Sequence, residues 1–167
     1  MHHAWKSISR ACLAVSTPLL VAAVFSTAAH ADEVRIPSLY AASSQSGWAH
    51  GVEKAGDNNF ATRWEAGTTK AQTWIAISFL VPTEVFQLRF KEHESRLSTY
   101  KIQILKGLKW ITIDEGFGSG SSTSYSINIE EKVSAIRLIT TSVGNGLPSF
   151  SEFYAVRDTV AATTAAK

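Results

Sequence analysis

The stretch that decides the fold is Trp74-Ile75-Ala76-Ile77-Ser78-Phe79-Leu80, in which large apolar residues occupy every second position. Successive side chains of an extended strand point to opposite faces, so a period of two predicts a strand with one buried face. The same alternation recurs in residues 85–91 and 100–105. Three strands therefore follow from alternation alone.

Five further segments carry shorter patterns of the same kind. They are residues 36–42, 110–113, 124–129, 135–140 and 153–156. Gly, Ser and Asn separate the segments, and no amphipathic helix of convincing length occurs between them. About eight short strands joined by turns predict an all-β fold, an antiparallel β-sandwich of the jelly-roll kind.

The first 31 residues have the pattern of a secretory signal peptide. Lys6 and Arg10 form a basic start, an apolar stretch follows, and Ala29-His30-Ala31 provides a cleavage site of small residues. The apolar stretch is shorter than the ~20 residues that cross a bilayer. We therefore expect residues 1–31 to be removed and the domain at 32–158 to be exported, to the periplasm or out of the cell. Residues 159–167, rich in Ala and Thr, are expected to be disordered.

Length and charge limit the function classes. A chain of 167 residues is too short for an enzyme with separate cofactor and substrate domains. Removal of the 31-residue leader leaves 136 residues and takes away two of the 16 basic side chains, so that 14 basic residues face 14 acidic ones. The formal charge of +2 thus belongs to the leader, and nucleic acid is not an expected partner. Membrane binding is not expected either.

The sequence lacks the common catalytic motifs. It has no Gly-x-Ser-x-Gly elbow and no His-Glu-x-x-His zinc motif, and its one cysteine lies in the leader. Only His50 and His93 follow the leader, too few for a three-histidine zinc site. The paired acids Asp114-Glu115 and Glu130-Glu131 point to opposite strand faces, which suits solvation better than catalysis. We expect no enzymatic activity.

A series of short motifs covers residues 36–157. They are Ala41-Ala42-Ser43-Ser44, residues 54–64, residues 72–79, Tyr100-Lys101-Ile102, Trp110, Ile136-Arg137-Leu138 and Ser151-Glu152-Phe153. Their order and spacing resemble the discoidin family, also called the coagulation-factor C-type domain, which includes galactose-binding-like carbohydrate-binding modules. Lys91-Glu92-His93 and residues 96–101 and 148–153 look most like modules appended to bacterial α-fucosidases. The resemblance implies a galactose-binding-domain-like sandwich, here a non-catalytic binding module that stands alone.

A turn-prone loop offers oxygen ligands for a cation. Asp57, Asn59 and Thr62 place oxygen atoms at positions i, i+2 and i+5, and oxygen-only ligands suit calcium. The resemblance implies a structural calcium ion held by this loop and by the glutamate of the last strand. The ligands so implied are Lys54 (through its carbonyl), Asp57, Asn59, Thr62, Ser151 (through its carbonyl) and Glu152.

Two points bear on this calcium site. Asn58 stands where the family usually has glycine, and asparagine tolerates the left-handed backbone that such a turn needs. The alternative is a loop without metal, in which Asp57 caps backbone amides.

The tryptophans after the leader divide into two groups. Trp64, Trp74 and Trp110 occupy positions where the family has packing residues, and we expect them to pack. Trp48 lies in a polar segment without strand periodicity, where an aromatic ring more often serves recognition. A sugar can stack its C–H face on such a ring while charged groups bind its hydroxyls.

Charged partners for a sugar lie in two loops that the family resemblance places beside each other. The expected ligand-binding residues are Trp48, His50, Glu92, His93 and Arg96, and the expected partner is a terminal galactose- or fucose-type sugar of a glycan or glycoconjugate. The alternative is a solvated loop with a local Glu92–Arg96 pair. Arg63, next to Trp64, is expected to be structural.

Two other functions stay open. Some discoidin domains bind lipid through exposed apolar loop tips, for which Leu147 and Phe150 are the obvious residues here. Adhesion to a protein at the cell surface is the second alternative, and no sequence feature distinguishes it.

Overall fold

The computed structural model describes residues 34–69, 72–94, 96–118, 124–143 and 146–158. The predicted leader (1–31) and tail (159–167) lie outside these residues. The described elements, in order, are β1 (Val34–Arg35), β2 (Leu39–Ala42), the 3₁₀ helices η1 (Trp48–His50) and η2 (Val52–Ala55), β3 (Trp64–Glu65), β4 (Trp74–Glu92), β5 (Leu97–Lys106), β6 (Lys109–Phe117), β7 (Ser124–Val143) and β8 (Ser149–Arg157). Neither helix is long enough or apolar enough to cross a bilayer.

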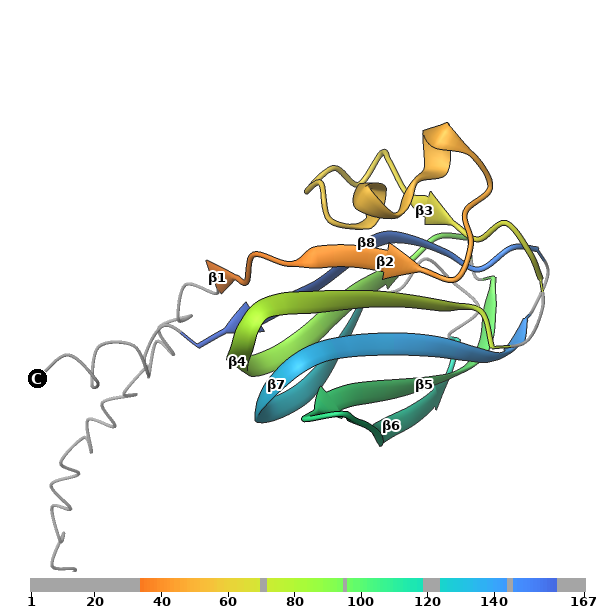
Figure 1. Cartoon of the computed structure of the whole chain (residues 1–167). Helices are drawn as coiled ribbons and strands as arrows, with labels where there is room; N and C mark the ends of the chain where they lie inside the picture. The colour runs from red at the N-terminus through yellow and green to blue at the C-terminus, as the bar shows by residue number, and fades with distance from the viewer. Residues whose placement is uncertain (1–33, 70–71, 95, 119–123, 144–145, 159–167) are drawn as a thin grey trace, which may run out of the picture.

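All strand pairs are antiparallel, which confirms the predicted all-β sandwich. The strand order is β1-β8-β4-β7-β5-β6, with β2 beside β4 and β3 beside β8. The long strands β4 and β7 turn back on themselves, at the left of Figure 1. Residues 74–78 of β4 pair with residues 135–139 of β7; on their other sides, this part of β4 pairs with β2, and this part of β7 pairs with β5. The remaining halves of β4 and β7 also pair with each other, and that half of β4 pairs with β8 on its other side. One continuous ladder therefore forms both layers.

The sequence predicted four separate strands where β4 and β7 run without a break. In β4 the register shifts between Ser78 and Thr83, and in β7 Glu130 has a φ of 50°. Irregularities of this kind bend a strand sharply while pairing continues on both sides. β1 and β3 were missed because two residues are too few to show a period.

The core lies between the two layers. The buried side chains of the predicted alternation in β4 are Ile75, Ile77 and Phe79. At one end of the core the rings of Trp64 and Phe150 stack, with centroids 5.8 Å apart and planes 2° apart. Both rings are fully buried, and the burial of each is worth about 1.5–3 kcal/mol. Phe150 is therefore not the exposed loop tip that lipid binding would need.

The packing prediction holds for Trp64 and is wrong for Trp74 and Trp110. These two side chains are partly exposed on the outer face of the sheet. The reason for Trp74 is its position in the alternation along the strand. Its neighbour Ile75 points into the core, so Trp74 points to the opposite face, as Ala76 does.

Candidate functional site

Strand β3 places a carboxylate at one end of the sandwich. Glu65 pairs with Ser149 of β8 in the ladder, and the Ser149 hydroxyl donates a hydrogen bond of 2.9 Å to the Trp64 carbonyl. The Oε2 atom of Glu65 accepts a hydrogen bond of 2.6 Å from Arg96 Nη1. Arg63 Nη2 lies 3.3 Å from the same oxygen. One carboxylate thus joins two arginines that are 33 positions apart in the chain.

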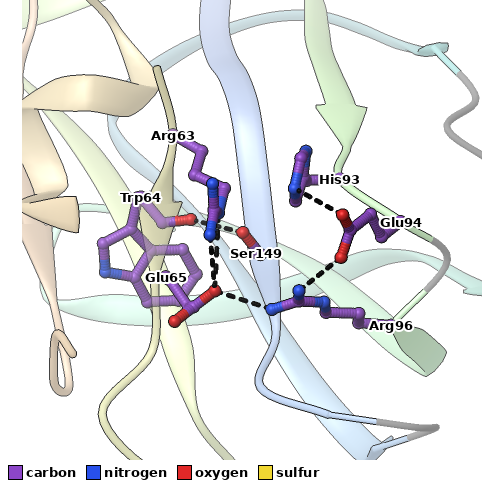
Figure 2. A network of polar contacts seen from close by, with 7 residues as sticks. All are labelled: Arg63, Trp64, Glu65, His93, Glu94, Arg96 and Ser149. Atoms are coloured by element: carbon purple, nitrogen blue, oxygen red, sulfur yellow. Dashed lines mark hydrogen bonds and ion pairs between the residues drawn. The ribbon is translucent and has the colours of Figure 1, made fainter. Parts of the chain in front are cut away.

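A second carboxylate extends this network, as Figure 2 shows. Arg96 Nη2 donates to Glu94 Oε2, and His93 Nε2 lies 3.4 Å from Glu94 Oε1. We call Arg63, Glu65, His93, Glu94 and Arg96 the loop-end cluster. The cluster brings together the predicted residues His93 and Arg96, and each cation in it contacts a carboxylate.

The pKa values of the cluster show how firmly its charges are held. Burial alone would raise the pKa of Glu65, but hydrogen bonds from Ser46, Arg96 and Arg63 lower it below its ordinary value. Burial would lower the pKa of Arg96, and its bonds to Glu94 and Glu65 raise it instead. Burial, and after it the charge of Arg63, lowers the pKa of His93. Near neutral pH the cluster therefore holds ionised acids and arginines around a neutral histidine.

Trp48 lies on a loop that β3 holds in place. The Ser46 amide donates to the Glu65 carbonyl at 2.9 Å, and Trp64 Nε1 donates to the Ser44 carbonyl at 3.1 Å. Two residues beyond Ser46, the Trp48 side chain is 95% exposed. An indole that is exposed to water and packs against no core residue is available to contact a ligand.

His50 and Glu92 have other surroundings. The Nδ1 atom of half-buried His50 has no hydrogen-bond partner in the described part of the chain. Glu92 is fully buried, and its Oε1 atom accepts a hydrogen bond from the Leu97 amide. Burial raises the pKa of Glu92, while the Leu97 bond opposes the rise. Glu92 thus fixes the loop that carries Arg96 and does not face solvent.

The Glu92–Arg96 side-chain pair of the alternative interpretation does not form. The Arg96 guanidinium lies between Glu65 and Glu94 instead, and Glu92 binds backbone. Sequence reasoning also missed Glu65 and Glu94 as partners. Glu94 was within reach of such reasoning, because it lies two positions from Arg96, whereas the contact between Glu65 and Arg96 spans 31 positions and has no local signal.

The predicted cation loop is closed by its own hydrogen bonds. Thr62 Oγ1 donates to the Asp57 carboxylate at 2.8 Å, and the Asn59 amide donates to Asp57 Oδ1 at 3.0 Å. Asn58 has a φ of 60°, which confirms the left-handed backbone expected at that position. Lys54 Nζ lies 3.9 Å from Asp57 Oδ2.

Glu152 approaches this loop from β8, where it follows buried Ser151. Its carboxylate is 1% exposed, and Oε2 accepts a hydrogen bond of 2.8 Å from Arg35 Nη1. Its Oε1 has no hydrogen-bond partner in the described structure. Burial raises the pKa of Glu152, Arg35 opposes the rise, and the charge of Asp57 adds to it. No three His, Cys, Asp or Glu residues of the described ranges gather as metal ligands, so an ion here would rest on two carboxylates and neutral oxygens.

The family of the chain follows from its sequence. The F5/8 type C domain matches residues 38–153. The chain belongs to this domain family. The resemblance to the discoidin or coagulation-factor C-type domains is thereby confirmed. No curated protein matches the F5/8 type C chain described here.

Solved structures with the same fold include carbohydrate-binding modules. Chitosan-binding module 1 of a Paenibacillus sp. IK-5 chitosanase/glucanase is 22% identical, with a TM-score of 0.63 over 71% of this chain and 93% of that one. The family 32 module of C. perfringens NanJ, in complex with galactose, is 14% identical, with a TM-score of 0.66 over 75% of this chain and 99% of the other.

A larger enzyme carries the fold as a part. The Ruminococcus gnavus GH29 fucosidase in complex with fucose is 18% identical, with a TM-score of 0.64 over 73% of this chain and 25% of the fucosidase. The F5/8 type C chain thus has the fold of a carbohydrate-binding module.

Proposed function

We propose that this F5/8 type C domain binds a terminal galactose- or fucose-type sugar at the loop end of the sandwich without transforming it. The observation that carries the proposal is Trp48, which is 95% exposed on a loop whose Ser46 amide donates a hydrogen bond to the Glu65 carbonyl. An exposed indole can stack on the apolar face of a sugar ring. With the predicted leader at residues 1–31, the domain would act outside the cytoplasm.

The loop-end cluster supplies the polar half of such a site. Arg96 is fixed by two carboxylates, so its position is set before a ligand arrives. His93, Glu94 and Arg63 keep part of their side chains exposed, which leaves donors and acceptors for hydroxyl groups. His50 lies on the same loop as Trp48, but its unpartnered Nδ1 atom is buried and does not face a ligand in this structure.

The acids of the described structure support binding rather than hydrolysis. A glycosidase needs one carboxylic acid of raised pKa facing the bond that it cleaves. The acids with a raised pKa here are Glu92 and Glu152, and both are buried. Glu65 and Glu94 reach the loop end, and hydrogen bonds from Arg96 and its neighbours keep their pKa values low.

A glycan array with purified wild-type protein and Trp48→Ala tests this proposal. Trp48→Ala should weaken binding at least about tenfold with the melting temperature unchanged, because the exposed ring contributes no core packing. The matched control is Leu108→Ala, which removes a fully exposed apolar side chain from the turn between β5 and β6. Equal binding of Trp48→Ala and wild type, or a panel without any bound galactosyl or fucosyl glycan, would contradict the proposal.

We also propose a structural calcium ion between the Asp57 loop and Glu152. The donors are all hard oxygens, and the buried, unpartnered Glu152 Oε1 is the atom that a cation would satisfy. Lys54 and Ser151 would add carbonyl oxygens, and Asn59 and Thr62 neutral side-chain oxygens. The ion would link the Asp57 loop to β8 and so stabilise the part of the domain that carries Trp48.

Thermal unfolding measures this calcium site without any sugar. Calcium should raise the melting temperature relative to excess EDTA, because an ion that binds only the folded state stabilises it. Asp57→Asn should remove the rise, and Glu115→Asn, in an exposed pair with Lys101, should keep it. Identical melting of the wild type in calcium and EDTA would contradict the site.

A further inference from the structure

The outer face of the sheet carries a groove that shares no residue with the loop-end cluster. It has a volume of about 400 Å³. Its floor consists of small residues, and its walls are two indoles and one arginine. We call it the sheet-face groove, and the residues that matter are Trp74, Ala76, Ser78, Trp110, Ala135 and Arg137.

The strand register explains why these residues share one face. Ala76 pairs with Arg137, and Arg137 pairs with Gln103 of β5. Trp110 pairs with Leu105, which in turn pairs with Ala135. Because side chains alternate along a strand, these residues point outward, while their neighbours Ile77, Ile136 and Ile104 are buried in the core.

The side chain of Arg137 is fixed in this groove by two contacts. Its Nε donates a hydrogen bond of 2.8 Å to Gln103 Oε1, and Gln103 Nε2 donates to Thr112 Oγ1 at 2.9 Å. The guanidinium carbon lies 4.1 Å from the centroid of the Trp110 ring. A cation–π contact and one hydrogen bond fix the side chain but do not neutralise it.

No carboxylate of the described ranges forms an ion pair with Arg137. Arg35, Arg63 and Arg96 are each paired with an acid. Burial lowers the pKa of Arg137, which shows that its charge is partly removed from water. A partly desolvated guanidinium gains from an anion, and its planar fork matches a carboxylate.

We propose that the sheet-face groove binds a polysaccharide that carries carboxylates, that is, a uronic-acid chain, with Arg137 receiving a carboxylate and Trp74 and Trp110 stacking on sugar rings. The indoles are three strands apart, roughly 14 Å in the direction across the sheet. That span suits an extended chain better than a single sugar. Residues 32–167 include 14 basic and 14 acidic residues, so a polyanion would be attracted to this domain by Arg137 itself rather than by a general positive charge.

This second site goes beyond the proposed loop-end function and is tested separately from it. Binding of the full chain to polygalacturonate is compared with binding to the fully methyl-esterified polymer, without added divalent cations. The ester keeps the sugar backbone and removes the negative charge. The wild type should bind the acid at least about tenfold more tightly than the ester.

Five variants assign the binding. Arg137→Gln should reduce the affinity for polygalacturonate to that for the ester, and Trp110→Ala should weaken both polymers. The control Arg157→Gln removes an exposed arginine at the end of β8 and should leave both affinities unchanged. Trp48→Ala should also leave them unchanged, which separates this groove from the loop end. Thermal melting shows that each variant is folded, and Arg137→Lys, which keeps the charge and loses the fork, should bind with intermediate affinity.

The proposal is overturned if the wild type binds neither polymer, if acid and ester bind equally, or if Arg157→Gln weakens binding as much as Arg137→Gln. The last outcome would mean unspecific attraction of a polyanion. Loss of galactosyl or fucosyl binding in Trp48→Ala, with polygalacturonate binding kept, would support both sites at once.

Discussion

The arginines of the loop end and of the outer sheet face differ in the groups that they contact. At the loop end, Arg63 and Arg96 share Glu65 and are neutralised within the protein. On the sheet face, Arg137 contacts an amide and an aromatic ring, and no carboxylate of the described ranges forms an ion pair with it. A neutralised cluster offers fixed hydrogen-bonding geometry to a neutral sugar, whereas an unpaired cation favours an anion.

The two regions also differ in what lies beneath them, and this difference predicts the largest effect. Trp64 is fully buried under the loop end and stacks on Phe150. Trp64→Ala should lower the free energy of unfolding by about 3–5 kcal/mol. Trp110→Ala, on the half-exposed sheet face, should lower it by about 1 kcal/mol. Urea unfolding of both variants measures the contrast, and equal losses would show that the sheet face is part of the core.

The next largest effect concerns the shared carboxylate. Glu65→Ala leaves the charges of Arg63 and Arg96 partly buried and less compensated, and should cost about 2–3 kcal/mol of unfolding free energy. Glu115→Ala breaks the more exposed pair with Lys101 and should cost less than about 1 kcal/mol. A loss for Glu65→Ala no greater than for Glu115→Ala would mean that the loop-end cluster does not stabilise the fold.

The sequence predicted the fold from alternation, and alternation also held information on the two tryptophans of the sheet face. Trp74 is in phase with Ala76 and Ser78, and Trp110 is in phase with Thr112. The packing prediction followed the family pattern instead of this phase and was wrong for both. The bends in β4 and β7 had no comparable signal, because a register shift depends on the partner strand.

The candidate site was predicted in part. The structure brings Arg96 and His93 into one cluster beside the loop of Trp48, as the loop assignment implied. It places Glu92 inside the protein, and it makes Glu65 the centre of the network. A contact between residues 65 and 96 depends on how β3 and β4 lie in space. Local sequence therefore could not reveal it.

The smallest expected effect is on the pH dependence of stability, and it depends on the charges around His93 in the loop-end cluster. Burial and the charge of Arg63 lower the pKa of His93, so the unfolded chain, with a pKa near 6.5, takes up a proton first as the pH falls. Protonation then favours unfolding, and stability declines as the pH falls from 6.5 through the lower pKa of the folded state. His93→Gln should flatten the pH dependence in this window by less than about 1 kcal/mol and leave it unchanged above pH 7.

Urea unfolding of the wild type and His93→Gln between pH 5 and pH 8 measures this difference, and titration of the common carboxylates cancels in the comparison. The opposite sign, a wild type that gains stability on acidification relative to the variant, would mean that Glu94 outweighs burial and Arg63 at His93. The loop end would then present a net negative field. Such a field would set it still further apart from the sheet face, because it would repel the carboxylates that Arg137 is proposed to bind.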